Sequence, residues 1–168
     1  MRAKNAPSLR PVLPADAPRL AALLRASVET LAEDFYDDDQ RAAWASVVDN
    51  EAAFGKTLSQ NLAIVALIDG EIAGFASLKD ARILDMLYVH PDYARRGVGS
   101  ALADALERLG AARGAQSLSV DASDAARAFF DKRGYIPQSR NTVAIKGEWL
   151  GNTTMTKALA PPLATGHA

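Results

Sequence analysis

The sequence predicts a mixed α/β domain in which helices cover both faces of one mostly antiparallel, mixed sheet of six to seven strands. Two observations predict it. The expected elements run strand, two or three helices, three strands, helix, strand, helix and one or two closing strands. The 168 residues are 49% apolar and 23% charged, which is typical of a globular chain with one sizeable core. We therefore expect a single domain over residues 1–160 and a loose tail over 161–168.

The N-terminal third predicts an edge strand followed by helices. Residues 8–13 form the strand, at an edge because Pro11 has no amide proton for a central ladder. Asp16 is expected to cap a helix whose apolar residues recur at helical spacing, namely Leu20, Leu23, Leu24, Val28 and Leu31. After an acidic stretch, Asp37 or Asp38 is expected to cap a second helix with one apolar side, formed by Ala43, Trp44, Val47 and Val48.

The middle of the chain predicts a hairpin, a third strand and a helix. Two β-rich runs over residues 61–78 are joined by Asp69-Gly70, a pair that accepts the positive φ angles of a two-residue turn. Residues 81–89 continue as a strand. Apolar positions from Val98 to Leu109 follow helical spacing, and we expect this helix to end near Gly110.

The C-terminal part predicts a short strand, a short helix and one or two final strands. Residues 117–121 are the strand, and Ser123 or Asp124 is expected to cap a helix that Gly134 stops. Alternating apolar residues on either side of Lys146-Gly147 predict the closing strands.

Composition excludes several classes of site and partner. The chain has no cysteine, which excludes disulfides, thiolate nucleophiles, iron–sulfur clusters and cysteine zinc sites. With two histidines, no intrinsic metal site is expected, and a net charge of −1 gives no general attraction to nucleic acid or membranes. No apolar run is long enough to span a membrane and no signal-peptide core is present, so we expect a cytoplasmic protein.

The stretch Arg95-Arg96-Gly97-Val98-Gly99 precedes the predicted helix at 98–109. The glycines allow a ligand to approach the main chain, and the first turn of a helix offers free amides that favour phosphate. A tight turn with solvated arginines is the alternative, because short glycine motifs are weak signals. The Walker A pattern is absent, and Leu102 breaks a G-x-G-x-x-G reading.

Read together with its neighbours, this stretch resembles the GNAT superfamily of acyl-CoA-dependent N-acetyltransferases. Their signature [QR]-x-x-G-x-[GA] follows a "V-x-P" strand end, and Val89-His90-Pro91 and Gly97-Val98-Gly99 match it; Ala94 stands at the usual Gln or Arg. "ASDAARAFFDKRGY" is similar to the family's later helix, with Phe130 at the usual Tyr. "YDDDQRAAWA" and the closing "NTVAIKGEWLGNTTMTKAL" resemble a bacterial subgroup of uncharacterised members.

The resemblance implies a three-layer fold whose fourth and fifth strands splay into a V, with acetyl-CoA as cosubstrate in the opening. It also implies a free N–H near Leu87 or Tyr88 that polarises the thioester carbonyl. The implied cofactor-binding residues are Leu87, Tyr88, Val89, Arg95, Arg96, Gly97, Val98, Gly99, Ser100, Ala101, Arg127 and Phe130.

The catalytic candidates follow from the need to deprotonate an amine near neutral pH. Asp85 lies in an apolar run, on the same strand face as Ile83, Leu87 and Val89 by alternation, and is the first candidate for base or amine anchor. A carboxylate satisfied by nearby backbone or an arginine is the alternative. Asp121 is the second, with helix capping as its alternative. Since Phe130 cannot protonate a leaving thiolate, a water or a tyrosine such as Tyr88 or Tyr135 is left for that role.

Acceptor recognition is expected in the acidic stretch, where five of residues 33–39 are carboxylates. A cationic amine suits Glu33 and Asp37, with Phe35 and Tyr36 adding cation–π attraction. A solvated loop with a helix cap is the alternative. The partner expected is an amine of unknown identity, and the chain is a monomer or homodimer.

The predicted activity is acetyl transfer from acetyl-CoA to a primary amine of a small molecule or peptide, directly in a ternary complex. A CoA-binding sensor with little turnover is the alternative from another class, and Ile83, Ala94 and Phe130 lean towards it. A generic anion-binding domain is the third reading.

Overall fold

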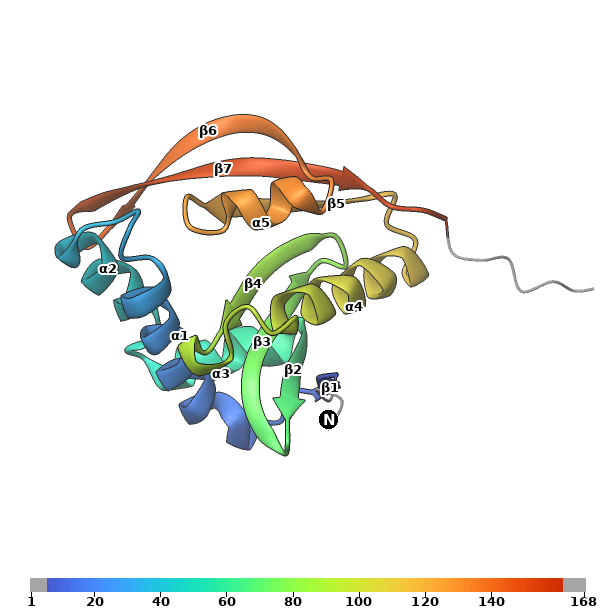
Figure 1. Ribbon diagram of the computed structural model, residues 1–168, viewed down its shortest axis with the longest axis horizontal. Helices are drawn as coiled ribbons and strands as arrows, with labels where there is room; N and C mark the ends of the chain where they lie inside the picture. The colour runs from blue at the N-terminus through green and yellow to red at the C-terminus, as the bar shows by residue number, and fades with distance from the viewer. Residues whose placement is uncertain (1–5, 162–168) are drawn as a thin grey trace, which may run out of the picture.

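The structure is a computed structural model that describes residues 6–161. Seven strands form one sheet in the order β1-β2-β3-β4-β5-β7-β6 (Figure 1). The neighbouring strands β4 and β5 are parallel, and every other neighbouring pair in this sheet is antiparallel. The strands are β1 (Ser8–Pro11), β2 (Leu62–Ile68), β3 (Glu71–Lys79), β4 (Ile83–Val89), β5 (Ser117–Ser123), β6 (Ile136–Ile145) and β7 (Glu148–Ala158). The helices are α1 (Ala17–Leu31), α2 (Asp38–Ala45), α3 (Glu51–Gln60), α4 (Val98–Ala112) and α5 (Arg127–Lys132). The predicted mixed sheet is confirmed; residues 162–168 of the expected tail lie outside the described range.

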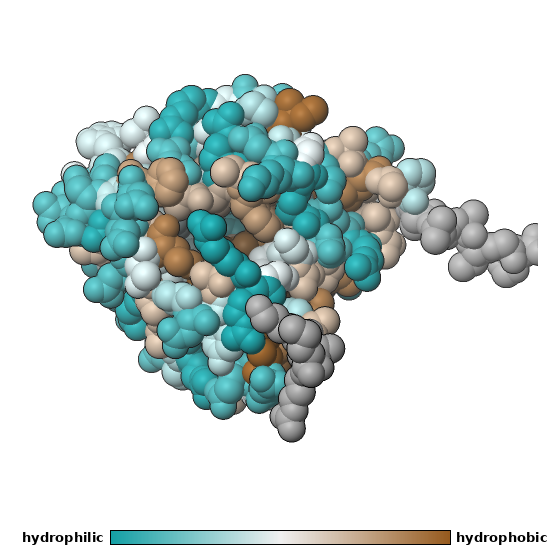
Figure 2. Space-filling model, viewed as in Figure 1, coloured by the Kyte–Doolittle hydropathy of each residue, from teal (hydrophilic) through white to brown (hydrophobic). Residues whose placement is uncertain are grey.

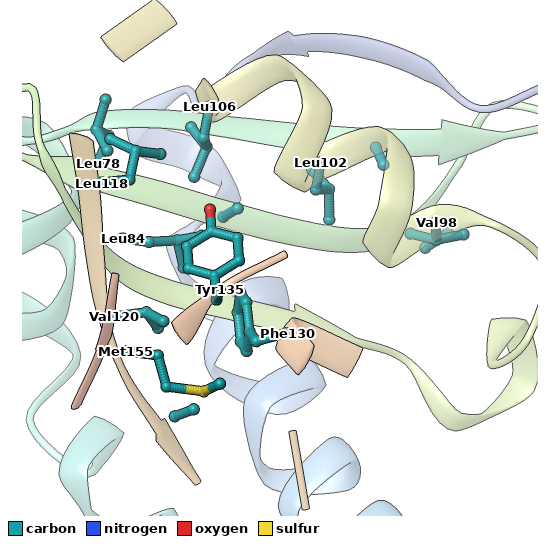
Figure 3. Close-up of a cluster of buried hydrophobic side chains, with 14 of the residues drawn as sticks. Leu78, Leu84, Val98, Leu102, Leu106, Leu118, Val120, Phe130, Tyr135 and Met155 are labelled. Atoms are coloured by element: carbon teal, nitrogen blue, oxygen red, sulfur yellow. The ribbon is translucent and has the colours of Figure 1, made fainter. Parts of the chain in front are cut away.

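Two separate cores cover the two faces of the sheet. On one face, α4 and α5 pack against the strands, and Figure 3 shows Leu102 and Leu106 of α4 in one cluster with Leu84, Leu118 and Val120 of the strands. On the other face, α1 and α3 pack on β2 and β3 around the fully buried Phe75. None of the helices within residues 6–161 is long and apolar enough to cross a membrane.

Both predicted two-residue turns are confirmed. Asp69 and Gly70 have φ angles of 50° and 81° between β2 and β3, and Lys146 and Gly147 have 44° and 80° between β6 and β7. Positive φ at both turn residues matches the twist of the flanking strands, which is why these dipeptides set the register of each hairpin.

The helical region differs from the prediction in three details. Asp16 lies at the N-cap position of α1 as expected, but its carboxylate accepts from the Leu13 amide and pairs with Arg10 and makes no capping hydrogen bond to the helix. Asp37 does cap α2 and accepts from the Gln40 amide, but α2 ends at Ala45 and leaves Val47 51% exposed. A third helix, α3, precedes the β2–β3 hairpin. Helix α4 runs two residues beyond Gly110, near which the sequence predicted its end.

Strands β4 and β5 separate almost as soon as they meet, as expected. They pair at Ile83–Ser119 and Leu84–Val120, after which β4 runs on to Val89 beside β3 while β5 follows β7. Asp85 is the extra residue of a bulge, because Ser77 pairs with Met86 and Leu78 with Leu84. The bulge interrupts side-chain alternation along β4 exactly where the two strands part.

The bulge corrects the predicted face of Asp85. Leu84 and Leu87 both pack in the α4-side core although they are three residues apart, while Met86 packs in the α1-side core. Asp85 therefore lies next to Leu84 on the opposite, α1 side, not on the face of Leu87 and Val89. Its side chain is exposed and accepts a hydrogen bond from Asn61 at 3.3 Å, so it is not the buried acid that the apolar run indicated.

Candidate active site

A cavity of about 490 Å³ passes through the sheet where β4 and β5 separate. Residues of α1 line it on one face, the first turn of α4 and residues of α5 line it on the other, and the edges of β4 and β5 form its sides. Figure 2 shows a hollow on the surface of the molecule that is bordered by apolar residues. The cavity thus connects the helix start at Gly97 with the α1 side of the sheet.

The start of α4 forms the end of this cavity on the α4 side. Gly97 has a φ of 80°, which a residue with a side chain rarely adopts, and turns the chain into the helix. The amides of Val98, Gly99 and Ser100 lie in the first turn and have no partner within the helix. The amide of Ala101 donates to the carbonyl of Gly97 at 3.0 Å, so its predicted contact with an anion is not available.

Gly99 leaves space that a side chain would fill. A Cβ at this position would lie 3.4 Å from the Phe129 ring and 3.8 Å from a methyl group of Val89, and all three residues line the cavity. Val98, between the glycines, is 1% exposed and packs in the core, as expected. The sequence G-V-G therefore anchors the helix through its valine and keeps the cavity side bare.

The three predicted arginines differ in position. Arg95 lines the cavity with a left-handed φ of 60°. Arg96 does not line it; its guanidinium lies 5.4 Å from the centre of the Tyr93 ring. Arg127 does not line it either, because Thr153 accepts its hydrogen bond at 3.3 Å and Asp131 pairs with it at 3.5 Å.

The free edge of β4 presents main-chain groups to the cavity. The His90 amide, just beyond β4, donates to the Ala73 carbonyl of β3. Because this orientation repeats every second residue, Tyr88 and Met86 also direct their amides and carbonyls towards β3. Leu87 and Val89 direct theirs towards the gap left by β5. Of the two predicted amides, geometry favours that of Leu87 over that of Tyr88.

Two carboxylates lie at the apex of the V. Asp85 and Asp121 directly follow the last paired residues of β4 and β5, and both line the cavity. Val120 and Ala122 pack in the α4-side core, so Asp121 lies on the α1 side, as Asp85 does. The Thr154 hydroxyl donates to Asp121 at 2.6 Å and leaves its other oxygen open.

A second cavity, of about 150 Å³, adjoins the first on the α1 side. Four residues line both cavities: Trp44, Tyr88, Asp121 and Ser123. The rest of its lining comes from Tyr36 and from strands β6 and β7. Asp121 is the carboxylate at this junction, whereas Asp85 lines the larger cavity and not the second one.

Tyr88 lies at the same junction and keeps its hydroxyl proton at neutral pH. Trp44 Nε1 donates to its hydroxyl at 3.1 Å, and burial raises the pKa of the phenol to about 12. The indole takes an acceptor position of the oxygen, so the phenol's own proton points elsewhere.

The acidic stretch contributes less than expected to either cavity. Tyr36 is buried and lines the second cavity, where its hydroxyl donates to the Gly151 carbonyl and accepts from the Asp124 amide. Glu33, Phe35 and Asp37 line neither cavity. Phe35 is 54% exposed and Asp37 caps α2, which agrees with the alternative of a solvated loop and a helix cap.

Residues 31–159 match the family model described as an acetyltransferase (GNAT) domain. The chain belongs to the GNAT acetyltransferases. This membership agrees with the splayed β4–β5 pair and makes the protein an acyltransferase enzyme.

Two relatives of this GNAT chain are similar over nearly its full length. An uncharacterized N-acetyltransferase, YafP of Escherichia coli, is 33% identical over 147 residues, which cover 88% of this chain and 93% of the relative. The crystal structure of a GCN5-related N-acetyltransferase from Rhodopseudomonas palustris is 55% identical, with a TM-score of 0.91 over 95% of this chain and 99% of the other.

A more distant structure shares the fold. PaiA N-acetyltransferase of Thermoplasma acidophilum, solved in complex with coenzyme A, has a TM-score of 0.76 at 17% identity, over 92% of this chain and 99% of the other. Coenzyme A is thus a ligand of a protein with this fold.

Several lining residues of the GNAT site escaped sequence reasoning. Phe129 borders the glycine turn, and Trp44 was placed on the apolar side of its helix. Ser27, Val28 and Leu31 of α1 were interpreted only as a helix. The second cavity's β6 and β7 residues carried no signal beyond strand alternation. No local pattern marks such residues, because their position depends on which elements meet across the sheet.

Proposed function

We propose that this GNAT enzyme transfers an acetyl group from acetyl-CoA to a primary amine by direct attack within a ternary complex. The observation that carries the proposal is the cavity through the sheet, which has free main-chain amides on the α4 side and two carboxylates on the α1 side. An anionic cofactor arm and a cationic acceptor suit these opposite ends.

The residues present fit acetyl-CoA. The amides of Val98, Gly99 and Ser100, with Arg95 beside them, provide donors for a pyrophosphate. The edge of β4 at Leu87 and Val89 offers a pantetheine arm the pairing that β5 leaves vacant. The Leu87 amide is the donor nearest the carboxylates along this edge, and we assign it to the thioester oxygen, where negative charge develops during attack.

The two carboxylates prepare the amine. An ammonium has no lone pair, so one proton must leave before attack. We assign proton acceptance to Asp121, which lines both cavities, and cation binding to Asp85 across the apex. The amine nitrogen then bonds to the carbonyl carbon and the carbon–sulfur bond breaks. The nitrogen's second surplus proton passes through solvent to the thiolate, which gives free CoA and the neutral acetylated amine.

Replacement of each carboxylate by its amide tests this assignment. We expect Asp121→Asn to lower kcat by about a hundredfold or more, because general bases contribute that much. We expect Asp85→Asn chiefly to raise the amine KM. The measurement is release of the CoA thiol over a range of amine concentrations.

The control is Asp80→Asn, an exposed carboxylate in the β3–β4 turn whose left-handed φ of 52° an asparagine accepts. Acetyl-CoA binding, followed by thermal stabilisation, should persist in all three variants. Unchanged turnover in Asp121→Asn would overturn its role. CoA binding without acetylation of any amine would favour the sensor function.

A further inference from the structure

We infer that the second cavity holds the apolar body of the acceptor, so that the substrate class is a monoamine carrying an apolar group about the size of a benzene ring. This inference rests on the proposed function and deepens it. It assigns the acceptor's specificity to Tyr36, Trp44, Val143, Ile145 and Leu150 rather than to the acidic stretch.

The volume of the cavity matches one small ring. Its volume is about 150 Å³, and a dry protein cavity of about that volume, lined by apolar side chains, binds benzene. A peptide chain or a polyamine would extend beyond this volume. A methyl or hydroxyethyl group leaves most of the surface uncovered.

Beside Asp121, the polar side chains of Ser123 and Asn152 line the cavity. Its other walls are largely apolar, because the polar atoms of Tyr36 and Trp44 are already used. The Tyr36 hydroxyl bridges Gly151 and Asp124, and the Trp44 N–H is given to Tyr88. The Tyr36 and Trp44 rings meet edge to face with centroids 5.6 Å apart. Opposite these rings, β6 and β7 contribute Val143, Ile145 and Leu150.

Charge places the amine end at the junction. Asp121 is the charged residue among those that line the second cavity, and it also faces the first. A single carboxylate at the mouth of an apolar cavity suits one ammonium group with an apolar body behind it. A second cation on the acceptor would be buried against rings and aliphatic groups without a partner, which is costly.

Val143 is a lining side chain that can be enlarged without disturbing the core, because the cavity lies at the edge of the molecule. Gln40 of α2 donates to the Trp149 carbonyl, and α2 lies beside the end of the β6–β7 hairpin in Figure 1. Val143 lines the cavity from β6 and is 38% exposed. Ala144 follows it on the same strand, is exposed, lines neither cavity and faces the other way.

The experiment compares acetylation of benzylamine, ethanolamine, spermidine and a tripeptide amide with a free N-terminus. We expect kcat/KM for benzylamine to exceed that for each of the others by at least about tenfold. Val143→Trp should raise the benzylamine KM by at least about tenfold, since the indole fills the cavity. The ratio of kcat/KM for benzylamine to that for ethanolamine should therefore fall by at least about tenfold, and the matched Ala144→Trp should leave this ratio unchanged.

The outcomes separate this inference from the proposed function. Preference for spermidine or the peptide, or equal effects of Val143→Trp and Ala144→Trp, would overturn the assigned class while acetylation itself stands. If no amine is acetylated, calorimetry of benzylamine with the CoA-bound enzyme decides. Binding that Val143→Trp weakens supports the ligand class and overturns turnover; absence of binding overturns both.

Discussion

At the scale of single residues, Tyr88 combines a buried ring with a hydroxyl at the meeting point of the two cavities. Burial raises its pKa to about 12, well above the ordinary thiol value of about 8.5, so proton transfer from the phenol to a CoA thiolate is unfavourable. We expect it to donate a hydrogen bond to the departing sulfur instead. Tyr88 therefore fits a stabilising donor better than the proton-transferring acid expected from sequence.

Tyr88→Phe should lower kcat by about tenfold while the KM for acetyl-CoA changes little, because a hydrogen bond to a charged group contributes about 1.5 kcal/mol or more. Steady-state kinetics with saturating amine measures this. Tyr135→Phe is the control, since the Tyr135 hydroxyl donates to Glu107 and lines neither cavity. Equal losses in both variants would contradict a role for Tyr88 in transfer.

The sequence identified Asp85 and Asp121 one at a time, each as a carboxylate at a strand position. It could not show that they flank the same apex, because that depends on the register of β4 against β5, two strands separated by a whole helix. The face of Asp85 was wrong for a local reason. A bulge adds one residue to a strand without leaving a mark in an apolar run such as "ILDML".

At the scale of elements, the first turn of α4 depends on a bare surface at Gly99. We expect Gly99→Val to abolish CoA binding while the domain stays folded. The new Cβ would meet Phe129 and Val89 at ordinary contact distances, so folding tolerates it, but the side chain occupies the space beside the free amides.

Thermal melting with and without CoA measures the effect. At a hundred times the dissociation constant, CoA should stabilise the parent enzyme by about 2.7 kcal/mol and the variant not at all. Ala112→Val, at the exposed end of the same helix, controls for a β-branched residue and should bind normally. A full CoA response in Gly99→Val would refute the placement of the CoA pyrophosphate at the first turn of α4.

Elements with a strong local signal were predicted well. Both hairpins follow from dipeptides that accept positive φ, and α1 and α4 follow from apolar spacing. The break between α2 and α3 had no such signal. Here Trp44 and Val48 pack into the core while Val47 between them turns to solvent, so tertiary contacts decided where the helix ends.

At the scale of the whole molecule, buried phenols link stability to alkaline pH. Burial raises the pKa of Tyr36, Tyr88 and Tyr135 above the ordinary value of about 10. The folded state therefore keeps protons that the unfolded state loses. This contribution is fully present below about pH 10 and declines as pH rises towards the folded-state pKa, which is about 12 for Tyr88.

We expect the free energy of unfolding in urea to fall between about pH 9 and about pH 11, because the unfolded phenols ionise across this range. Tyr88→Phe and Tyr135→Phe should each make the fall smaller than in the parent protein, whatever their stability at neutral pH. The same loss in parent and variants would show that other groups carry the pH dependence.

The sequence by itself determined the hairpins, the main helices, the glycine turn at the start of α4 and the family to which they point, because each depends on residues close together in the chain. Only the tertiary structure decided that Asp85 and Asp121 meet at one apex and that Ala101 is engaged within the helix. It also showed that the second cavity lies between α2 and the β6–β7 hairpin and that Glu33, Phe35 and Asp37 line neither cavity. The physical reason is that strand register and helix packing bring distant residues together, and no short pattern encodes their meeting.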